Sequence, residues 1–175
     1  MPIGDVFLVA PIVVELDKRK PKKILDLGCG TGLYGAIIRQ WLDHGVKAFK
    51  TTLHGVEGWP AYHNPIWDLY DKIETISIEQ FLQNNTEKYN CIIFTDVIEH
   101  FEKNEGLQII DKIKEHLSPG GVFIISTPYY FHIQDAVYGN EYERHRSHWK
   151  VMDFLRKGFK VVNQRPSILG IYLKQ

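Results

Sequence analysis

Short β-branched runs alternate with helical patterns from Lys23 onward, and no other feature constrains the fold of this chain as strongly. The alternation is typical of βαβ units, which predict an α/β fold: a doubly wound, mostly parallel sheet with helices on both faces. Strands are expected at residues 24–27, 52–56, 73–77, 91–95, 121–126, 159–163 and 168–173. The first helix is indicated by apolar residues at the spacing of one helix face: Tyr34, Ile37, Ile38, Trp41 and Leu42.

The final third of the chain changes character. Residues 127–147, called the excursion below, are rich in Tyr, His, Arg and Glu without a clear period, which predicts an insertion outside the sheet that shapes an acceptor site. A short helix is expected at 148–157. The last two strands are linked only by residues 164–167, and so short a link requires an antiparallel hairpin.

Composition narrows the class of protein. The 175 residues carry 21 Lys and Arg against 21 Asp and Glu, which predicts one globular domain over 1–175 and argues against a protein that coats nucleic acid. Residues 1–22 are expected to be a helical extension, with a helix over 3–16. The apolar stretch 6–16 is broken by Pro11, so neither a signal peptide nor a membrane span is expected. Two cysteines build no disulfide framework, which favours the reducing cytoplasm.

Glycines stand at alternate positions between the first strand and the first helix, at Gly28, Gly30 and Gly32. Such glycines let the backbone turn sharply and approach a ligand without a Cβ clash. Residues 30–35 also match the G-x-G-x-x-G pattern of dinucleotide sites, so a nicotinamide-dependent oxidoreductase stays an alternative. The loop lacks the Lys followed by Ser or Thr of a phosphate-binding P-loop.

Charge at the strand ends distinguishes these ligands. In an open α/β sheet, the carboxyl ends of the strands face the ligand crevice, and here they carry Asp26, Glu57, Asp96 and Glu99. Carboxylates repel a pyrophosphate and attract a cation. The sequence therefore predicts a positively charged ligand with hydroxyl groups.

Three segments together resemble class I S-adenosylmethionine-dependent methyltransferases: I-L-D-L-G-C-G-T-G at 24–32, T-D-V-I-E-H-F at 95–101 and L-S-P-G-G-V-F-I-I-S-T-P at 117–128. The resemblance implies a seven-stranded sheet whose last strand is inserted antiparallel. It also implies that S-adenosylmethionine is the cofactor and S-adenosylhomocysteine the product. The cofactor-binding residues that it implies are Asp26, Gly28, Cys29, Gly30, Gly32, Glu57, Gly58, Ser77, Ile78 and Asp96.

Within that resemblance, the glycine loop and Asp26 hold the methionine part of the cofactor, with Asp96 on the same side. Glu57 accepts hydrogen bonds from the ribose hydroxyls, and Ser77 and Ile78 border the adenine. Transfer of a methyl group from a sulfonium is an in-line displacement, for which the protein mainly aligns the reactants. A base is needed only when the acceptor must lose a proton, and the candidates for that role are His100, His145 and His148.

The expected acceptor is a small or medium-sized molecule methylated at oxygen. The chain has no N-P-P-Y or D-P-P-Y tetrapeptide and no Pro-Cys nucleophile, which argues against related amino-group and cytosine C5 methyltransferases. Nucleic acid is not favoured as a partner and no membrane is expected. A protein partner, a homodimer and a non-catalytic cofactor-binding subunit stay open, because little of the chain lies outside the core fold.

A metal-assisted alternative depends on four residues, Asp96, Glu99, His100 and His148. The D-x-x-E-H cluster with a further histidine resembles the metal ligands of small-RNA terminal 2′-O-methyltransferases, and the cluster alone resembles those of quinone-biosynthesis O-methyltransferases. Carboxylates and histidine can hold a divalent ion that lowers the pKa of a hydroxyl. Asp96 replaces the glutamate of those enzymes, however, and D-V-I-E-H-F also occurs in methyltransferases without metal. We therefore do not favour a metal.

Overall fold

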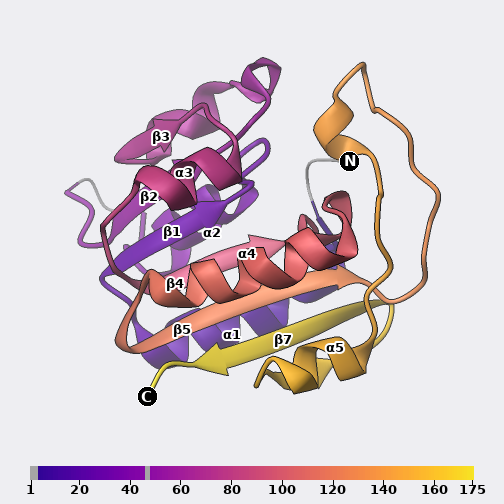
Figure 1. Cartoon of the computed structure of the whole chain (residues 1–175). Helices are drawn as coiled ribbons and strands as arrows, with labels where there is room; N and C mark the ends of the chain where they lie inside the picture. Colours follow the sequence, from indigo (N-terminus) through magenta and orange to yellow (C-terminus); the bar gives the residue numbers. More distant parts are fainter. Residues whose placement is uncertain (1–3, 46–47) are drawn as a thin grey trace.

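A seven-stranded sheet forms the centre of the protein in a computed structural model that describes residues 4–45 and 48–175 (Figure 1). The strands lie in the order β3-β2-β1-β4-β5-β7-β6. Neighbours from β3 to β5 pair in parallel, whereas β7 is antiparallel to both β5 and β6. Their bounds are β1 Lys23–Leu27, β2 Thr52–Val56, β3 Lys72–Glu74, β4 Tyr89–Thr95, β5 Leu117–Pro128, β6 Lys160–Asn163 and β7 Ser167–Leu173.

Helices cover both faces of the sheet. Helices α1 and α2 pack on one face and α3, α4 and α5 on the other. Their bounds are α1 Val9–Arg19, α2 Leu33–Trp41, α3 Ile78–Asn84, α4 Lys103–Glu115 and α5 Val151–Arg156. Short 3-10 helices join these elements: η1 Val6–Leu8, η2 Pro60–Tyr62, η3 Pro65–Leu69, η4 Ile98–His100 and η5 Glu141–Glu143.

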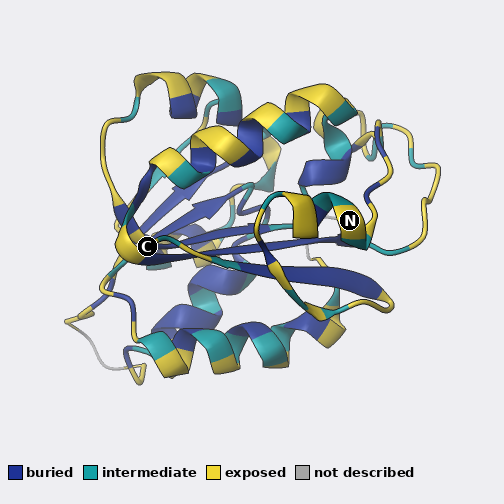
Figure 2. Ribbon diagram, turned by 60° about the horizontal axis from the view of Figure 1, so that its bottom comes forward, coloured by how far each residue is buried: buried dark blue, intermediate teal, exposed yellow. Residues whose placement is uncertain are grey.

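Two apolar cores result from the alternation of side chains along the strands. In β4, Ile92 and Phe94 point into the core beneath α3, α4 and α5, while Cys91 and Ile93 point into the core beneath α1 and α2. Figure 2 shows the strands buried between helical layers whose outer surfaces are exposed. Burial on both faces explains why the strands read as nearly continuous apolar runs.

The predicted α/β class, with seven strands and an antiparallel terminal hairpin, is confirmed. The third strand ends earlier than predicted, at Glu74, because Ser77 is the N-cap of α3: its hydroxyl oxygen accepts a hydrogen bond from the Gln80 amide at 3.2 Å. The prediction missed α3. The helix expected at 148–157 is the shorter α5.

Two other predicted elements also differ in detail. The strand expected at 121–126 is longer: it begins at Leu117, which already pairs with Tyr89, and it ends at Pro128, so the first two residues of the excursion belong to the sheet. At the N-terminus, the helix expected over 3–16 consists of η1 followed by α1, which continues to Arg19, and its first residue, Ile3, lies outside the described residues. Within 4–45 and 48–175, no helix combines the length and apolar character needed to cross a bilayer.

Candidate functional site

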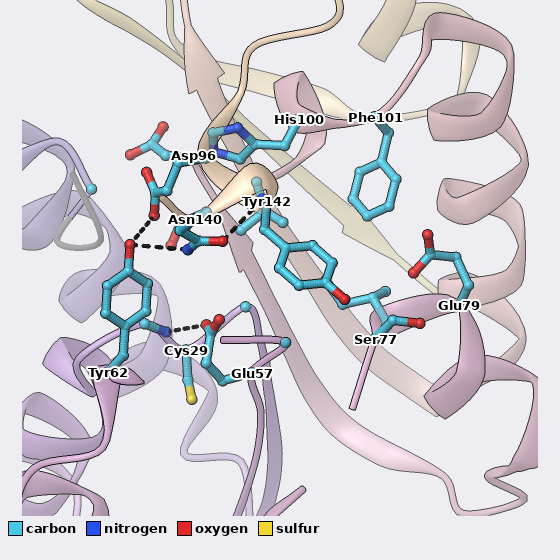
Figure 3. Close-up of a pocket in the computed structure, with 18 of the residues that line it drawn as sticks. Cys29, Glu57, Tyr62, Ser77, Glu79, Asp96, His100, Phe101, Asn140 and Tyr142 are labelled. Carbon is cyan, nitrogen blue, oxygen red and sulfur yellow. Dashed lines mark hydrogen bonds between the residues drawn. The ribbon is translucent and has the colours of Figure 1, made fainter. Parts of the chain in front are cut away.

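A cavity of about 250 Å³ lies at the carboxyl ends of β1, β2 and β4 (Figure 3). Its walls come from the glycine loop, the turn after β2, the start of α3, the segment after β4 and the excursion. Nine of the residues implied or proposed above line it: Gly28, Cys29, Gly30, Glu57, Gly58, Ser77, Ile78, Asp96 and His100. The parallel strand order therefore brings together residues that are far apart in the sequence.

Backbone geometry requires glycine in the loop after β1. Gly28, Gly30 and Gly32 have φ of 71°, 53° and 94°, in the left-handed region that disfavours other residues. A Cβ on Gly28 would lie 2.6 Å from Cγ2 of Val97, and one on Gly32 would lie 2.9 Å from Cγ2 of Ile66. Gly28 and Gly30 line the cavity, whereas Gly32 does not.

Tyr70 packs directly beneath this loop. A Cβ on Gly35 would lie 2.2 Å from Cε2 of Tyr70, and the Gly35 amide donates a hydrogen bond to the Tyr70 hydroxyl at 3.0 Å. That hydroxyl donates in turn to Oδ2 of Asp26 at 2.6 Å. The last glycine of the G-x-G-x-x-G match thus makes room for a tyrosine ring, which accounts for the match without a dinucleotide.

Asp26 lies under the cavity and does not line it. The side chain is 2% exposed, and burial raises its pKa to about 7, partly offset by the hydrogen bond from Tyr70 and reinforced by the charge of Glu57. At neutral pH an appreciable fraction of this carboxyl is therefore protonated. The structure places Asp26 where it supports the loop, so any effect on a ligand's ammonium group would be exerted through the loop.

Glu57 joins the glycine loop to the turn after β2 at the cavity wall. One carboxylate oxygen accepts a hydrogen bond from the Gly30 amide at 2.9 Å and the other from the Trp59 amide at 2.8 Å. Burial raises the pKa of Glu57, and these two amides oppose the rise. Because a carboxylate oxygen can accept more than one hydrogen bond, both oxygens can also accept from a neighbouring pair of hydroxyls.

Asp96 follows β4 in a left-handed conformation, with φ of 52°. Its Oδ2 accepts a hydrogen bond from the Asp5 amide at 2.7 Å, and its Oδ1 accepts from the Ser126 hydroxyl at 3.0 Å. Burial raises the pKa of Asp96. Non-glycine residues in this conformation are uncommon and gather at functional sites. The Asp5 contact also brings Gly4 to the cavity wall.

The three candidate histidines lie in different places. His100 lines the cavity, and its Nδ1 donates to the Arg144 carbonyl at 3.2 Å. His145 lies beside it, with ring centroids 5.0 Å apart, and its Nδ1 donates to the His132 carbonyl at 2.8 Å. His148 is exposed and its Nε2 donates to the Tyr129 carbonyl at 3.1 Å. Neither His145 nor His148 lines the cavity.

Burial lowers the pKa of His100 to about 4, and the neighbouring His145 adds to this effect while the Arg144 carbonyl opposes it. Burial also lowers the pKa of His145. Both rings are therefore neutral at pH 7. Since a carbonyl can only accept, each Nδ1 carries the hydrogen and each Nε2 keeps a lone pair.

The residues fit a metal in part. Glu99, His100 and His145 each offer one ligand atom, and these atoms lie within 4.8 Å of one another. The Glu99 carboxylate accepts a hydrogen bond from the Thr127 hydroxyl at 2.9 Å. Neutral imidazoles fixed by carbonyls are suited to ligation. Of the four candidates predicted from the sequence, Asp96 and His148 are not in this group, and His145 takes the place of the second histidine.

Part of the cavity wall was not predicted from the sequence: Asn140, Glu143 and Arg146 of the excursion. Tyr62 and Tyr142, which the sequence indicates as candidates for the adenine wall and the acceptor site, also line the cavity. The Tyr62 hydroxyl donates to Glu143 at 2.7 Å, and the Asn140 amide donates to Tyr62 at 3.2 Å. No spacing along the chain signals these contacts, because they join the turn after β2 to a segment about 80 residues later.

One comparison identifies the family of this chain. A family model described as a methyltransferase domain matches residues 8–163. No curated protein matches the chain in sequence.

Three solved structures share the fold. The PH0226 protein from Pyrococcus horikoshii OT3 has a TM-score of 0.69 and 19% identity, over 97% of this chain and 89% of that one. The 1,6-didemethyltoxoflavin-N1-methyltransferase from Burkholderia thailandensis, with 1,6-didemethyltoxoflavin and S-adenosylhomocysteine bound, has a TM-score of 0.66 and 14% identity, over 95% of this chain and 76% of that one. The methyltransferase domain of bacterial CtHen1-CN has a TM-score of 0.62 and 21% identity, over 95% of this chain and 96% of that one. Two O-methyltransferase structures are longer, and this chain spans 56% of each.

Proposed function

Because the chain belongs to the methyltransferase-domain family, we propose that it transfers the methyl group of S-adenosylmethionine to an oxygen atom of a small or medium-sized acceptor. The observation that carries this proposal is the cavity itself, where a glycine loop adjoins the carboxylates of Glu57 and Asp96. The methyl donor has a sulfonium, an ammonium group and a ribose diol. A buried acidic cavity favours such a cation and disfavours a dinucleotide pyrophosphate.

Residues that line the cavity can be assigned to each part of the donor. The glycine loop and Asp96 receive the methionine part, and Glu57 accepts from the two ribose hydroxyls. Ser77 and Ile78 border the adenine. The raised pKa values of Glu57 and Asp96 support this assignment, because burial is the largest cause of each rise and a bound cation would offset it. A bound sulfonium would lower both pKa values.

His100 is the proposed base. Its Nε2 lone pair accepts the proton of the acceptor hydroxyl while that oxygen attacks the methyl carbon, and the bond from the carbon to the sulfur breaks to release S-adenosylhomocysteine. His100 then passes the proton to water. A pKa of about 4 keeps the imidazole neutral and able to accept at pH 7, although it makes His100 a weak base. The alignment of reactants must therefore supply most of the rate.

Calorimetric titration with S-adenosylhomocysteine, with NAD as the competing ligand, tests the donor. We expect S-adenosylhomocysteine to bind at micromolar concentration and NAD not to bind. A panel of phenols, catechols and other hydroxyl compounds, assayed for transfer from radiolabelled S-adenosylmethionine, then tests the acceptor. Binding without turnover on the whole panel would favour a non-catalytic cofactor-binding subunit, and tight NAD binding would overturn the proposal.

The group of Glu99, His100 and His145 favours a second candidate function, metal-assisted methylation of a hydroxyl such as an RNA 2′-hydroxyl. These three residues would hold the ion, which would lower the pKa of the acceptor hydroxyl. Titration of the protein with Mn²⁺, in parallel with His145→Gln, tests binding, and activity after dialysis against EDTA tests the need for metal. Full activity after EDTA would exclude this candidate.

A further inference from the structure

We propose that Tyr142 forms one wall of the adenine site, so that the excursion closes over the cofactor in addition to bordering the acceptor. This inference rests on the proposed function, since it names a further cofactor-binding residue. It differs from the sequence-based expectation, which assigned the excursion to the acceptor alone.

Tyr142 lies against the backbone that follows the ribose-binding carboxylate. A Cβ on Gly58 would lie 3.0 Å from both Cε2 and Cζ of the Tyr142 ring. Gly58 follows Glu57 directly, so the ring stands one residue from the carboxylate assigned to the ribose. Because the base of a nucleoside is attached to its ribose, a base whose ribose binds Glu57 would lie next to this ring.

Buried contacts hold this part of the excursion in place. Asn140 is 1% exposed, and its Oδ1 accepts a hydrogen bond from the Tyr142 amide at 2.9 Å, which begins η5. On the far side of Tyr142, Glu143 is buried and accepts from the Tyr62 hydroxyl at 2.7 Å. The residues before and after Tyr142 are thus both joined to the turn after β2. The ring is positioned before any ligand binds.

The ring itself keeps an open face. Tyr142 is 49% exposed although its neighbours Asn140 and Glu143 are buried, and it lines the cavity. Figure 3 shows the ring between Asn140 and Ser77, with its hydroxyl directed toward Ser77 and with Phe101 and Glu79 beyond. An aromatic face, a second aromatic ring and a carboxylate that can accept from an amino group suit a flat aminopurine.

Calorimetry with two probes tests the assignment. S-adenosylhomocysteine and adenosine are titrated into the full chain and into three variants, Tyr142→Ala, Tyr142→Phe and Tyr138→Ala. Tyr138 is the matched control because it lies in the same excursion and is 90% exposed. We expect Tyr142→Ala to weaken both probes about tenfold, a typical loss for one base-stacking ring. The other two variants should stay within twofold of wild type.

The outcomes separate this inference from the proposed function. If the wild-type chain does not bind S-adenosylhomocysteine, the proposed function fails. The inference is overturned if the wild type binds S-adenosylhomocysteine and Tyr142→Ala binds both probes as tightly as the wild type does. It is also overturned if Tyr142→Ala loses affinity for S-adenosylhomocysteine but not for adenosine. Should Tyr142→Ala fail to fold, Tyr142→Trp provides a second measurement. Stacking on adenine should quench its added fluorescence relative to Tyr142→Phe, and unchanged fluorescence at saturation would contradict the inference.

Discussion

The two sides of the cavity are built in different ways. On one side, Gly28, Glu57 and Asp96 follow the parallel strands β1, β2 and β4, whose ends meet at one edge of the sheet. On the other side, His100 in η4 and His145 in the excursion meet because the amides of residues 146 and 147 both donate to the Glu99 carbonyl, at 2.8 and 3.0 Å. The first arrangement follows from topology, whereas the second depends on hydrogen bonds between η4 and the excursion.

The pKa shifts on the two sides have opposite directions and share one cause. Burial raises the pKa of Glu57 and Asp96 on the strand side and lowers the pKa of His100 and His145 on the loop side. In both cases burial disfavours the charged form of the group. A cationic donor would restore the charge of the acids but not that of the histidines. The strand side is therefore suited to binding a cation, and the loop side provides neutral imidazoles.

The largest expected effect tests the loop side. We expect His100→Gln to lower kcat about a hundredfold, because the variant removes the base, and to leave the affinity for S-adenosylhomocysteine within twofold. His148→Gln is the matched control, since His148 is exposed and outside the cavity. Steady-state assays with the best hydroxyl acceptor of the panel provide the comparison. An equal loss of kcat in both variants would show that His100 has no special role as the base.

A smaller effect concerns the acid beneath the strand side. The folded-state pKa of Asp26 is about 7, above its ordinary value of 3.8, so its protonated form stabilises the fold at low pH and this stabilisation is lost as pH rises through 7. Between pH 5 and pH 8 the loss is about 2 to 3 kcal/mol. Asp26→Asn stays neutral and should lack this dependence.

Chemical denaturation of the ligand-free protein at both pH values measures this difference. The free energy of unfolding of Asp26→Asn, relative to wild type, should rise from pH 5 to pH 8. Asp68→Asn, at an exposed position, should show no such rise. A constant difference for Asp26→Asn across this range would show that the carboxyl is ionised throughout and that it faces a cation or water.

The smallest effect tests Glu57, the residue that joins the glycine loop to the turn after β2. Glu57→Gln keeps one acceptor oxygen and loses the charge, so we expect S-adenosylhomocysteine to bind about ten to thirty times more weakly, through lost charge-assisted hydrogen bonds. Calorimetry measures the change. Glu102→Gln, at an exposed glutamate before α4, is the control. Unchanged affinity in Glu57→Gln would show that the ribose does not bind this carboxylate.

Much of the strand side could be predicted from the sequence, and the loop side could not. Gly28 and Glu57 follow two strands that the sequence predicts, and their convergence follows from the parallel order of those strands. Asp26 shows the limit of that reasoning. Its place at a strand end predicts a cavity residue, but Tyr70, which is distant in the sequence, covers it with a hydrogen bond of 2.6 Å. The excursion has no periodicity that could reveal its contacts.

The sequence by itself determined the α/β class, the glycine loop and the acidic strand ends, because side-chain periodicity and the conformations of tight turns depend on local backbone geometry. Only the tertiary structure decided that His145 rather than His148 lies beside His100, that Asp26 lies under the loop, and that Tyr142 faces Gly58. Each of these outcomes depends on hydrogen bonds and packing between segments that are distant along the chain. Such contacts leave no repeating pattern in a single sequence.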